Sequence, residues 1–257
     1  MINKIINKIN NFFFKFVPKI ESDFYNIKHI GTQYGGYDIF DDNLSQPIII
    51  SCGLGEDASF DIEMINIYDA KVFSIDPTPR SCEYYNNLKK RFGKIGNGKF
   101  NETGFLNVDL YNLKKVNNNN FRYINKAIWS EYDKEIQLFF PKNKNFVSLS
   151  INNKEQYDEK NYILSKTISY DQIIKKHNLE KVDILKLDIE GAEIEVIHSL
   201  LNQEEKIFPN QLIVEFDIRR RPSFKSLREL NKVHRKIKKY YKLININAKG
   251  DFTYLRH

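Results

Sequence analysis

The chain has 257 residues, of which 41% are hydrophobic and 14% aromatic, and a formal net charge of +7. This composition excludes a disordered chain and allows one α/β domain with a core of its own. Two cysteines, Cys52 and Cys82, exclude a disulfide scaffold, and neither they nor the five histidines show a metal-ligand spacing. No apolar run approaches the ~18 residues that span a bilayer. We therefore expect an intracellular, cytoplasmic protein.

The first 20 residues have the pattern of an amphipathic helix, with lysines between the apolar side chains. The apolar positions are Ile2, Ile5, Ile6, Ile9, Phe12, Phe13 and Phe16. Lysine and asparagine interrupt the segment too often for a signal-peptide core. Either the helix packs its apolar face on the domain, or residues 1–19 lie on an anionic membrane surface. We favour packing, because most amphipathic helices cover a core.

Residues 21–257 are predicted to form a single domain that begins with an irregular lead-in at 20–46. An apolar strand at 47–52 then runs into a glycine turn, and a helix at 58–68 precedes a second strand at 71–76. A further helix follows at 81–92. This order of strand, glycine turn, helix, strand, acid and helix is typical of half a doubly wound sheet.

The second half continues the pattern less regularly. We predict strands at 121–129, 135–140, 182–187 and 211–217, a polar loop at 143–160, and helices at 169–177 and from Gly191. A basic helix and an antiparallel strand pair at 241–247 and 251–255 close the chain. The sequence thus predicts an α/β fold: a Rossmann-like, doubly wound, mostly parallel sheet with an antiparallel C-terminal strand pair.

Charged side chains gather where the apolar strand at 182–187 ends. Lys186, Asp188, Glu190 and Glu193 lie at the junction with the next helix. Open α/β sheets place ligand sites outside the carboxyl ends of their strands, and charges so near a core are costly unless paired or used. The alternative is purely structural: Lys186 would neutralise Asp188, and Glu190 would cap the helix.

A second candidate site lies at the glycine turn. Gly53 and Gly55 let the backbone turn sharply near a ligand, and Asp76, which ends the next strand, can accept hydrogen bonds from both ribose hydroxyls of an adenosine. With Ala58, the glycines satisfy the relaxed dinucleotide pattern G-x-G-x-x-A. The acids Glu56 and Asp57 would repel the pyrophosphate of NAD but suit the cationic S-adenosylmethionine (SAM).

The run K-L-D-I-E-G-A-E at 186–193 closely resembles the signature of the FkbM-type methyltransferases, which use SAM. The resemblance covers roughly residues 47–256 and includes the segments 51–60, 72–79, 125–129 and 139–150. It implies the class I methyltransferase fold. It also implies a set of SAM-binding residues: Cys52, Gly53, Leu54, Gly55, Asp57, Ser59, Asp76, Pro77, Ala127 and Asp188.

The resemblance further implies O-methylation, most often of a hydroxyl in a sugar or glycan acceptor. We assign Asp188 to orienting the cofactor or acceptor, and Glu190 or Asp217 to binding the acceptor or removing its proton. Two positions depart from the family pattern. Ser51-Cys52 replaces an acid in the first motif, and Asp217 stands where relatives often carry histidine. A divalent cation held by these acids and Glu215 is an alternative that we do not favour, so no metal site is assigned.

Two other functions compete with this assignment. The glycine pattern also suits an NAD-binding oxidoreductase. A non-catalytic protein with the methyltransferase fold could instead bind a glycan or a partner through the segment 219–239, which holds ten Lys or Arg residues and the single acid Glu229. No aromatic RNA-binding motif accompanies these charges, so we do not expect a nucleic-acid partner.

Overall fold

The structure is a computed structural model that describes residues 17–20, 25–96, 106–143, 148–151, 157–202, 207–216 and 223–257. The predicted N-terminal helix lies almost entirely outside the described residues and stays a prediction. Val17, which is described, packs against the larger hydrophobic cluster. In the described part of the chain, no helix combines the length and the apolar character needed to cross a bilayer.

A seven-stranded sheet in the order β11-β12-β10-β9-β3-β4-β5 forms the centre of the fold. Its strands are β3 (Ile48–Cys52), β4 (Lys71–Ile75), β5 (Phe121–Ile124), β9 (Ile184–Leu187), β10 (Gln211–Glu215), β11 (Tyr241–Ile246) and β12 (Asp251–Arg256). The five adjacent strands from β10 to the edge strand β5 are parallel, whereas β12 runs antiparallel to both β10 and β11. The predicted doubly wound sheet with an antiparallel C-terminal pair is confirmed.

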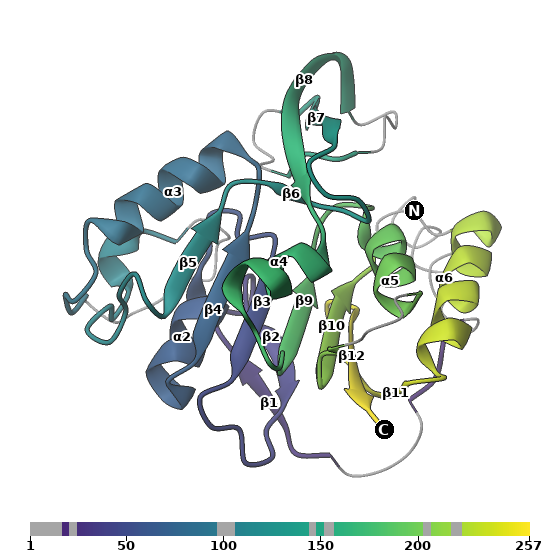
Figure 1. Cartoon of the computed structure of the whole chain (residues 1–257), viewed down its shortest axis with the longest axis horizontal. Coiled ribbons are helices and arrows are strands. Elements are labelled where there is room, and N and C mark those ends of the chain that lie inside the picture. The colour runs from purple at the N-terminus through teal and green to yellow at the C-terminus, as the bar shows by residue number, and fades with distance from the viewer. Residues whose placement is uncertain are drawn as a thin grey trace, which may run out of the picture.

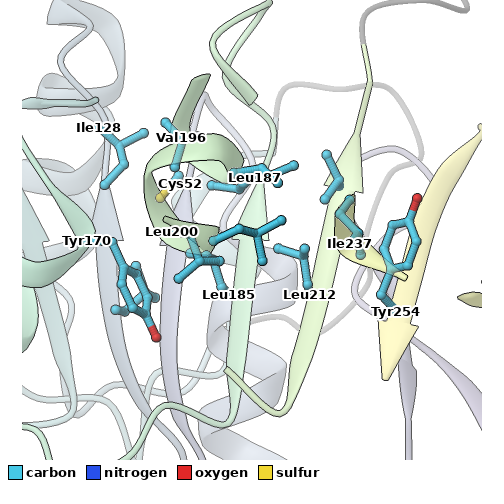
Figure 2. Packing of buried hydrophobic residues seen from close by; sticks show 14 of the residues in the cluster. Cys52, Ile128, Tyr170, Leu185, Leu187, Val196, Leu200, Leu212, Ile237 and Tyr254 are labelled. Atoms are coloured by element: carbon cyan, nitrogen blue, oxygen red, sulfur yellow. The ribbon is translucent and has the colours of Figure 1, made fainter. Parts of the chain in front are cut away.

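Alternating apolar residues let both faces of this sheet carry helices (Figure 1). In β3 and β9, Ile50 and Leu185 point into one cluster, and their neighbours Ile49 and Ile184 point into the other. The first cluster is covered by α4 (Tyr170–His177), α5 (Glu193–Leu201) and α6 (Phe224–Ile237), as Figure 2 shows for several of its side chains. The second is covered by α2 (Ser59–Tyr68) and α3 (Pro79–Lys89).

The lead-in at 20–46 is not irregular, and this part of the prediction was wrong. β1 (Ile27–Ile30) and β2 (Tyr37–Phe40) pair as an antiparallel hairpin that packs on the face covered by α2. Each strand has only four residues, and β1 exposes Lys28 and His29, so the alternation was too short to recognise.

A second, three-stranded sheet in the order β6-β8-β7 projects from the main body in Figure 1. It consists of β6 (Ala127–Ile128), β7 (Glu135–Pro141) and β8 (Tyr157–Ile168). The single strand predicted at 121–129 was wrong, because the chain leaves the main sheet after β5 and enters this one at β6. The loop predicted to reach residue 160 was also wrong, because β8 begins at Tyr157. The strand pattern of β8 could not be recognised in the sequence, because most residues in its first half are polar and exposed. A short 3-10 turn (Val108–Leu110) precedes β5.

We expect Leu185→Ala to lower the free energy of unfolding by about 2–5 kcal/mol, because Leu185 is fully buried in the central strand β9 and its loss leaves a cavity. Lys225→Ala, on the exposed side of α6, should change it by less than about 0.5 kcal/mol. Urea titration of both variants tests the contrast; equal losses would contradict the burial of β9.

Candidate active site

The strand register brings the predicted site residues together at one edge of the sheet. Cys52 is aligned with Ile75 on β4 and with Leu187 on β9. The residues that follow in each strand, Gly53, Asp76 and Asp188, therefore emerge side by side. Val214 is aligned with Leu187, which places Glu215 next to Asp188. Gly53, Asp76, Asp188 and Glu215 line one cavity of about 320 Å³.

The turn after β3 comes exceptionally close to the turn after β9. Gly53 has φ +87°, and a Cβ built on it would lie 1.9 Å from the backbone oxygen of Asp188. The amide of Asp188 donates a hydrogen bond to the carbonyl of Cys52 at 3.2 Å, which fixes the approach. Only glycine fits at this position, so the glycine turn and the acidic turn form one wall of the cavity.

Asp76 organises one end of the cavity through its carboxylate. Oδ2 accepts hydrogen bonds from the amides of Leu54 and Gly55, both at 3.0 Å, and Oδ1 accepts one from Thr78 at 2.8 Å. Asp76 is 4% exposed. The acid therefore holds the glycine turn in shape as well as facing the cavity.

The acids beside this turn have partners of their own. Glu56 forms a bidentate contact with Arg80, at 2.6 and 3.1 Å. Asp57 accepts hydrogen bonds from the hydroxyl of Thr32 at 2.6 Å and from the amide of Ser59 at 2.8 Å. Arg80 thus pairs with Glu56, and Asp57 joins the loop at Thr32 to the start of α2.

Asp188 lies on the side of the glycine turn that faces away from Asp76. Its Oδ2 accepts a hydrogen bond from the hydroxyl of Tyr37 at 2.7 Å. Lys186 donates to the carbonyl of Gly53 at 2.5 Å, and the structure shows no ion pair between Lys186 and Asp188. The structural alternative, in which Lys186 neutralises Asp188, is therefore wrong.

Glu193, and not Glu190, caps the turn that leads into α5. Its carboxylate accepts hydrogen bonds from the amides of Ile189 at 3.2 Å and Gly191 at 3.0 Å. Burial raises the pKa of Glu193 to about 8, although these donors oppose the shift. Glu190 and Gly191 adopt φ values of 52° and 104°, and Glu190 lines the cavity. This tight turn explains why α5 begins at Glu193, two residues later than predicted.

The second sheet supplies an apolar wall of the cavity. Ala127, Ile128 and Trp129 line it from β6 and its end, and Leu138 and Leu149 line it from β7 and the segment beyond. These side chains exclude water from one side of the cavity, whereas the turns of the main sheet place carboxylates on the other.

Most of the predicted site residues meet in this cavity. Those that line it are Gly53, Leu54, Gly55, Asp57, Asp76, Pro77, Ala127, Asp188 and Glu190. Cys52 and Ser59 are fully buried behind the wall and do not line it, and Asp217 lies outside the described residues. Among the described residues, no group of three His, Cys, Asp or Glu side chains is arranged to hold a metal ion.

Comparison with known proteins identifies the family. The family model described as methyltransferase FkbM domain matches residues 52–239, more than half of the chain. This chain belongs to the FkbM methyltransferase family. Among curated proteins none matches it significantly. A solved structure of a fibrillarin/Nop5p complex resembles it with a TM-score of 0.41 and 10% identity, over 82% of this chain and 73% of the other.

Four cavity-lining residues of this FkbM methyltransferase lie outside the matched segment, and the sequence analysis missed all four: Tyr34, Gly35, Tyr37 and Lys249. The first three belong to the hairpin that was expected to be irregular. Lys249 lies in the turn between β11 and β12, more than 60 residues after Asp188 in the chain. The pair Gly35-Gly36 was the one local signal, because glycines mark a close backbone approach.

Gly53→Ala should lower the free energy of unfolding by at least about 2 kcal/mol more than Gly55→Ala. Both residues have positive φ, but a Cβ on Gly55 would meet no atom within 4 Å, whereas one on Gly53 would strike the Asp188 backbone. Both variants share the backbone strain that a positive φ imposes on alanine. The difference between their free energies of unfolding, measured by urea titration, therefore isolates the contact with the Asp188 backbone. Equal losses would show that the two turns are not pressed together.

Glu193→Gln should become more stable relative to wild type as pH rises from 5 to 8. The folded-state pKa of Glu193 is raised to about 8, above its unfolded value, so the folded protein keeps a proton that the unfolded chain loses. The free energy of unfolding of the wild type therefore falls as pH rises from 5 to 8. That of the glutamine variant lacks this contribution. Urea titrations of both proteins at pH 5, 6.5 and 8 measure the difference between their free energies of unfolding. A difference that does not change with pH would contradict the raised pKa of Glu193.

Proposed function

We propose that this protein uses SAM to methylate a hydroxyl group, and that the hydroxyl belongs to a sugar or glycan acceptor. The observation that carries the proposal is one cavity that runs from Asp76, past the adjoining turns at Gly53 and Asp188, to Glu190 and Glu215. The first end suits an adenosine, and the second suits an acceptor that must lose a proton.

The hydrogen bonds at Asp76 leave room for a ribose. A carboxylate offers about four lone-pair sites, and three are used by backbone amides. Asp76 can therefore accept from one ribose hydroxyl, rather than from both as the sequence suggested. The volume of about 320 Å³ lies at the lower end of the range for small-molecule sites.

The charges lining the cavity favour a cationic ligand. Among its described lining residues are six acids (Glu56, Asp57, Asp76, Asp188, Glu190 and Glu215) and two lysines, Lys186 and Lys249. Arg80 neutralises one acid, and the rest still outnumber the lysines. SAM carries a sulfonium and an ammonium, whereas the pyrophosphate of NAD would meet repulsion.

Bound SAM would supply an electrophilic methyl group, and the protein would align the acceptor, exclude water and take its proton. The apolar wall at Ile128, Trp129 and Leu138 excludes water. We assign Asp188 to orienting the donor or the acceptor and Glu190 to accepting the proton. Asp217 is kept as the alternative proton acceptor.

Calorimetric titration with SAM and with NAD tests the cofactor. We expect SAM to bind and NAD not to bind, and Asp76→Asn to weaken SAM binding by about 10- to 100-fold, the worth of a hydrogen bond to a charged group. Glu135→Gln, which removes an exposed acid outside the cavity, is the matched control. Tight NAD binding without SAM binding would contradict the proposed use of SAM.

Transfer of label from methyl-labelled SAM to glycan fractions tests the reaction and the acceptor class. We expect incorporation that Glu190→Gln reduces by at least about 100-fold, because a positioned base contributes roughly 10²–10⁴ in rate, while SAM affinity stays close to wild type. Incorporation into protein or lipid without a glycan would overturn the acceptor assignment. Full SAM binding with no transfer to any fraction would favour a non-catalytic protein.

A further inference from the structure

Tyr37 makes the direct contact between the N-terminal hairpin and the acidic end of the cavity. It lies outside the segment that the family model matches, and its hydroxyl donates to Oδ2 of Asp188 at 2.7 Å. The structure gives no hydrogen bond to the other oxygen, Oδ1, from any described residue. The contact therefore fixes how the Asp188 carboxylate is turned and leaves Oδ1 for a ligand.

The Tyr37 ring is held by its surroundings. It is 3% exposed and packs edge-on against Phe60 with ring centroids 5.4 Å apart. The ammonium groups of Lys186 and Lys249 lie 4.6 and 4.7 Å from the ring centroid. Burial, and next the charge of Asp188, raise the pKa of Tyr37 well above its ordinary value, so its hydroxyl keeps the proton that it donates.

Lys249 fastens the hairpin over the cavity. Its ammonium donates to the carbonyls of Tyr34 at 2.9 Å and Gly36 at 2.6 Å, and lies 3.5 Å from Asp251. These contacts join the β11–β12 turn to the loop that precedes Tyr37. Lys249 thus acts together with Gln211 and Asn245, which also bind the N-terminal hairpin.

We propose that Tyr37, held from one side by Lys249, is a positioning residue that turns the Asp188 carboxylate toward the cationic part of the cofactor. The proposal rests on the proposed SAM-dependent function and adds two residues to it. The hydroxyl of Tyr37 occupies Oδ2 of Asp188 and thereby directs the other oxygen, Oδ1, toward a ligand.

Other charged groups surround Asp188 and stay the same when the Tyr37 hydroxyl is removed. Lys186 neighbours it on β9, Glu215 on β10, Asp251 on β12 and Glu193 on α5. Tyr37→Phe retains the ring, its contact with Phe60 and both nearby ammonium groups. The substitution therefore isolates the single hydrogen bond.

The test is calorimetric SAM binding at pH 7 by the full chain, its Tyr37→Phe variant, its Asp188→Asn variant and the double variant. We expect Tyr37→Phe to weaken SAM binding by about 10-fold, the worth of one hydrogen bond to a charged group. In the Asp188→Asn background the same substitution should cause little further loss, because the carboxylate that Tyr37 positions is gone, and an equal loss in both backgrounds would contradict the proposal. Lys249→Gln should weaken SAM binding in the same direction as Tyr37→Phe.

Tyr241→Phe is the matched control, because Tyr241 is also fully buried and donates one hydrogen bond, to the carbonyl of Pro209 at 2.9 Å. Its SAM affinity should match wild type, and thermal melting should show all variants folded. Wild-type SAM affinities for both Tyr37→Phe and Lys249→Gln would overturn the positioning role and leave the SAM assignment intact. Absence of SAM binding by the wild-type chain would overturn the proposed function and this inference with it.

Discussion

The site depends on the close approach of two turns, at Gly53 after β3 and at Asp188 after β9. No side chain larger than hydrogen fits between them. Lys186 reaches across the same gap to the Gly53 carbonyl. The turn that would hold the cofactor and the turn that carries the acids therefore form one rigid wall. Such rigidity matters for methyl transfer, because the reaction gains most from fixed alignment of its groups.

This constraint explains the signature K-L-D-I-E-G-A-E residue by residue. Lys186 joins the two turns, Leu187 fills the core, and Asp188 faces the cavity. Glu190 and Gly191 make the left-handed turn, and Glu193 caps it. Three of the four charged residues therefore build the wall, cap it or shape its turn, besides any contact that they make with a ligand.

Lys186 also has a charged neighbour beneath the site. Asp61 on α2 is 2% exposed, and burial raises its pKa to about 6 while the positive charge of Lys186 opposes the shift. A buried carboxylate beside a buried ammonium is tolerated because each lowers the cost of the other. Lys186 itself places its ammonium against the glycine turn, at the Gly53 carbonyl.

The main sheet and the cavity-lining residues at the ends of β3, β4 and β9 were predictable, because apolar strands and the glycine and acid positions that end them are local patterns. β1, β2 and β8 were not, since they are short or polar and are stabilised by contacts with distant segments. Tyr37 and Lys249 could not be found for the same reason: they approach Asp188 only after the chain has folded. The structural alternative paired Lys186 with Asp188 because they are close in sequence, whereas the strand register places Lys186 beside the Gly53 carbonyl.

The most direct test is a crystal structure of the full chain with S-adenosylhomocysteine, the demethylated cofactor. We predict a ribose hydroxyl within hydrogen-bonding distance of Asp76, and the sulfur and amino group at the Asp188 end of the same cavity. A ligand bound elsewhere, or bound in the reverse direction with its adenosine at Asp188, would contradict the account.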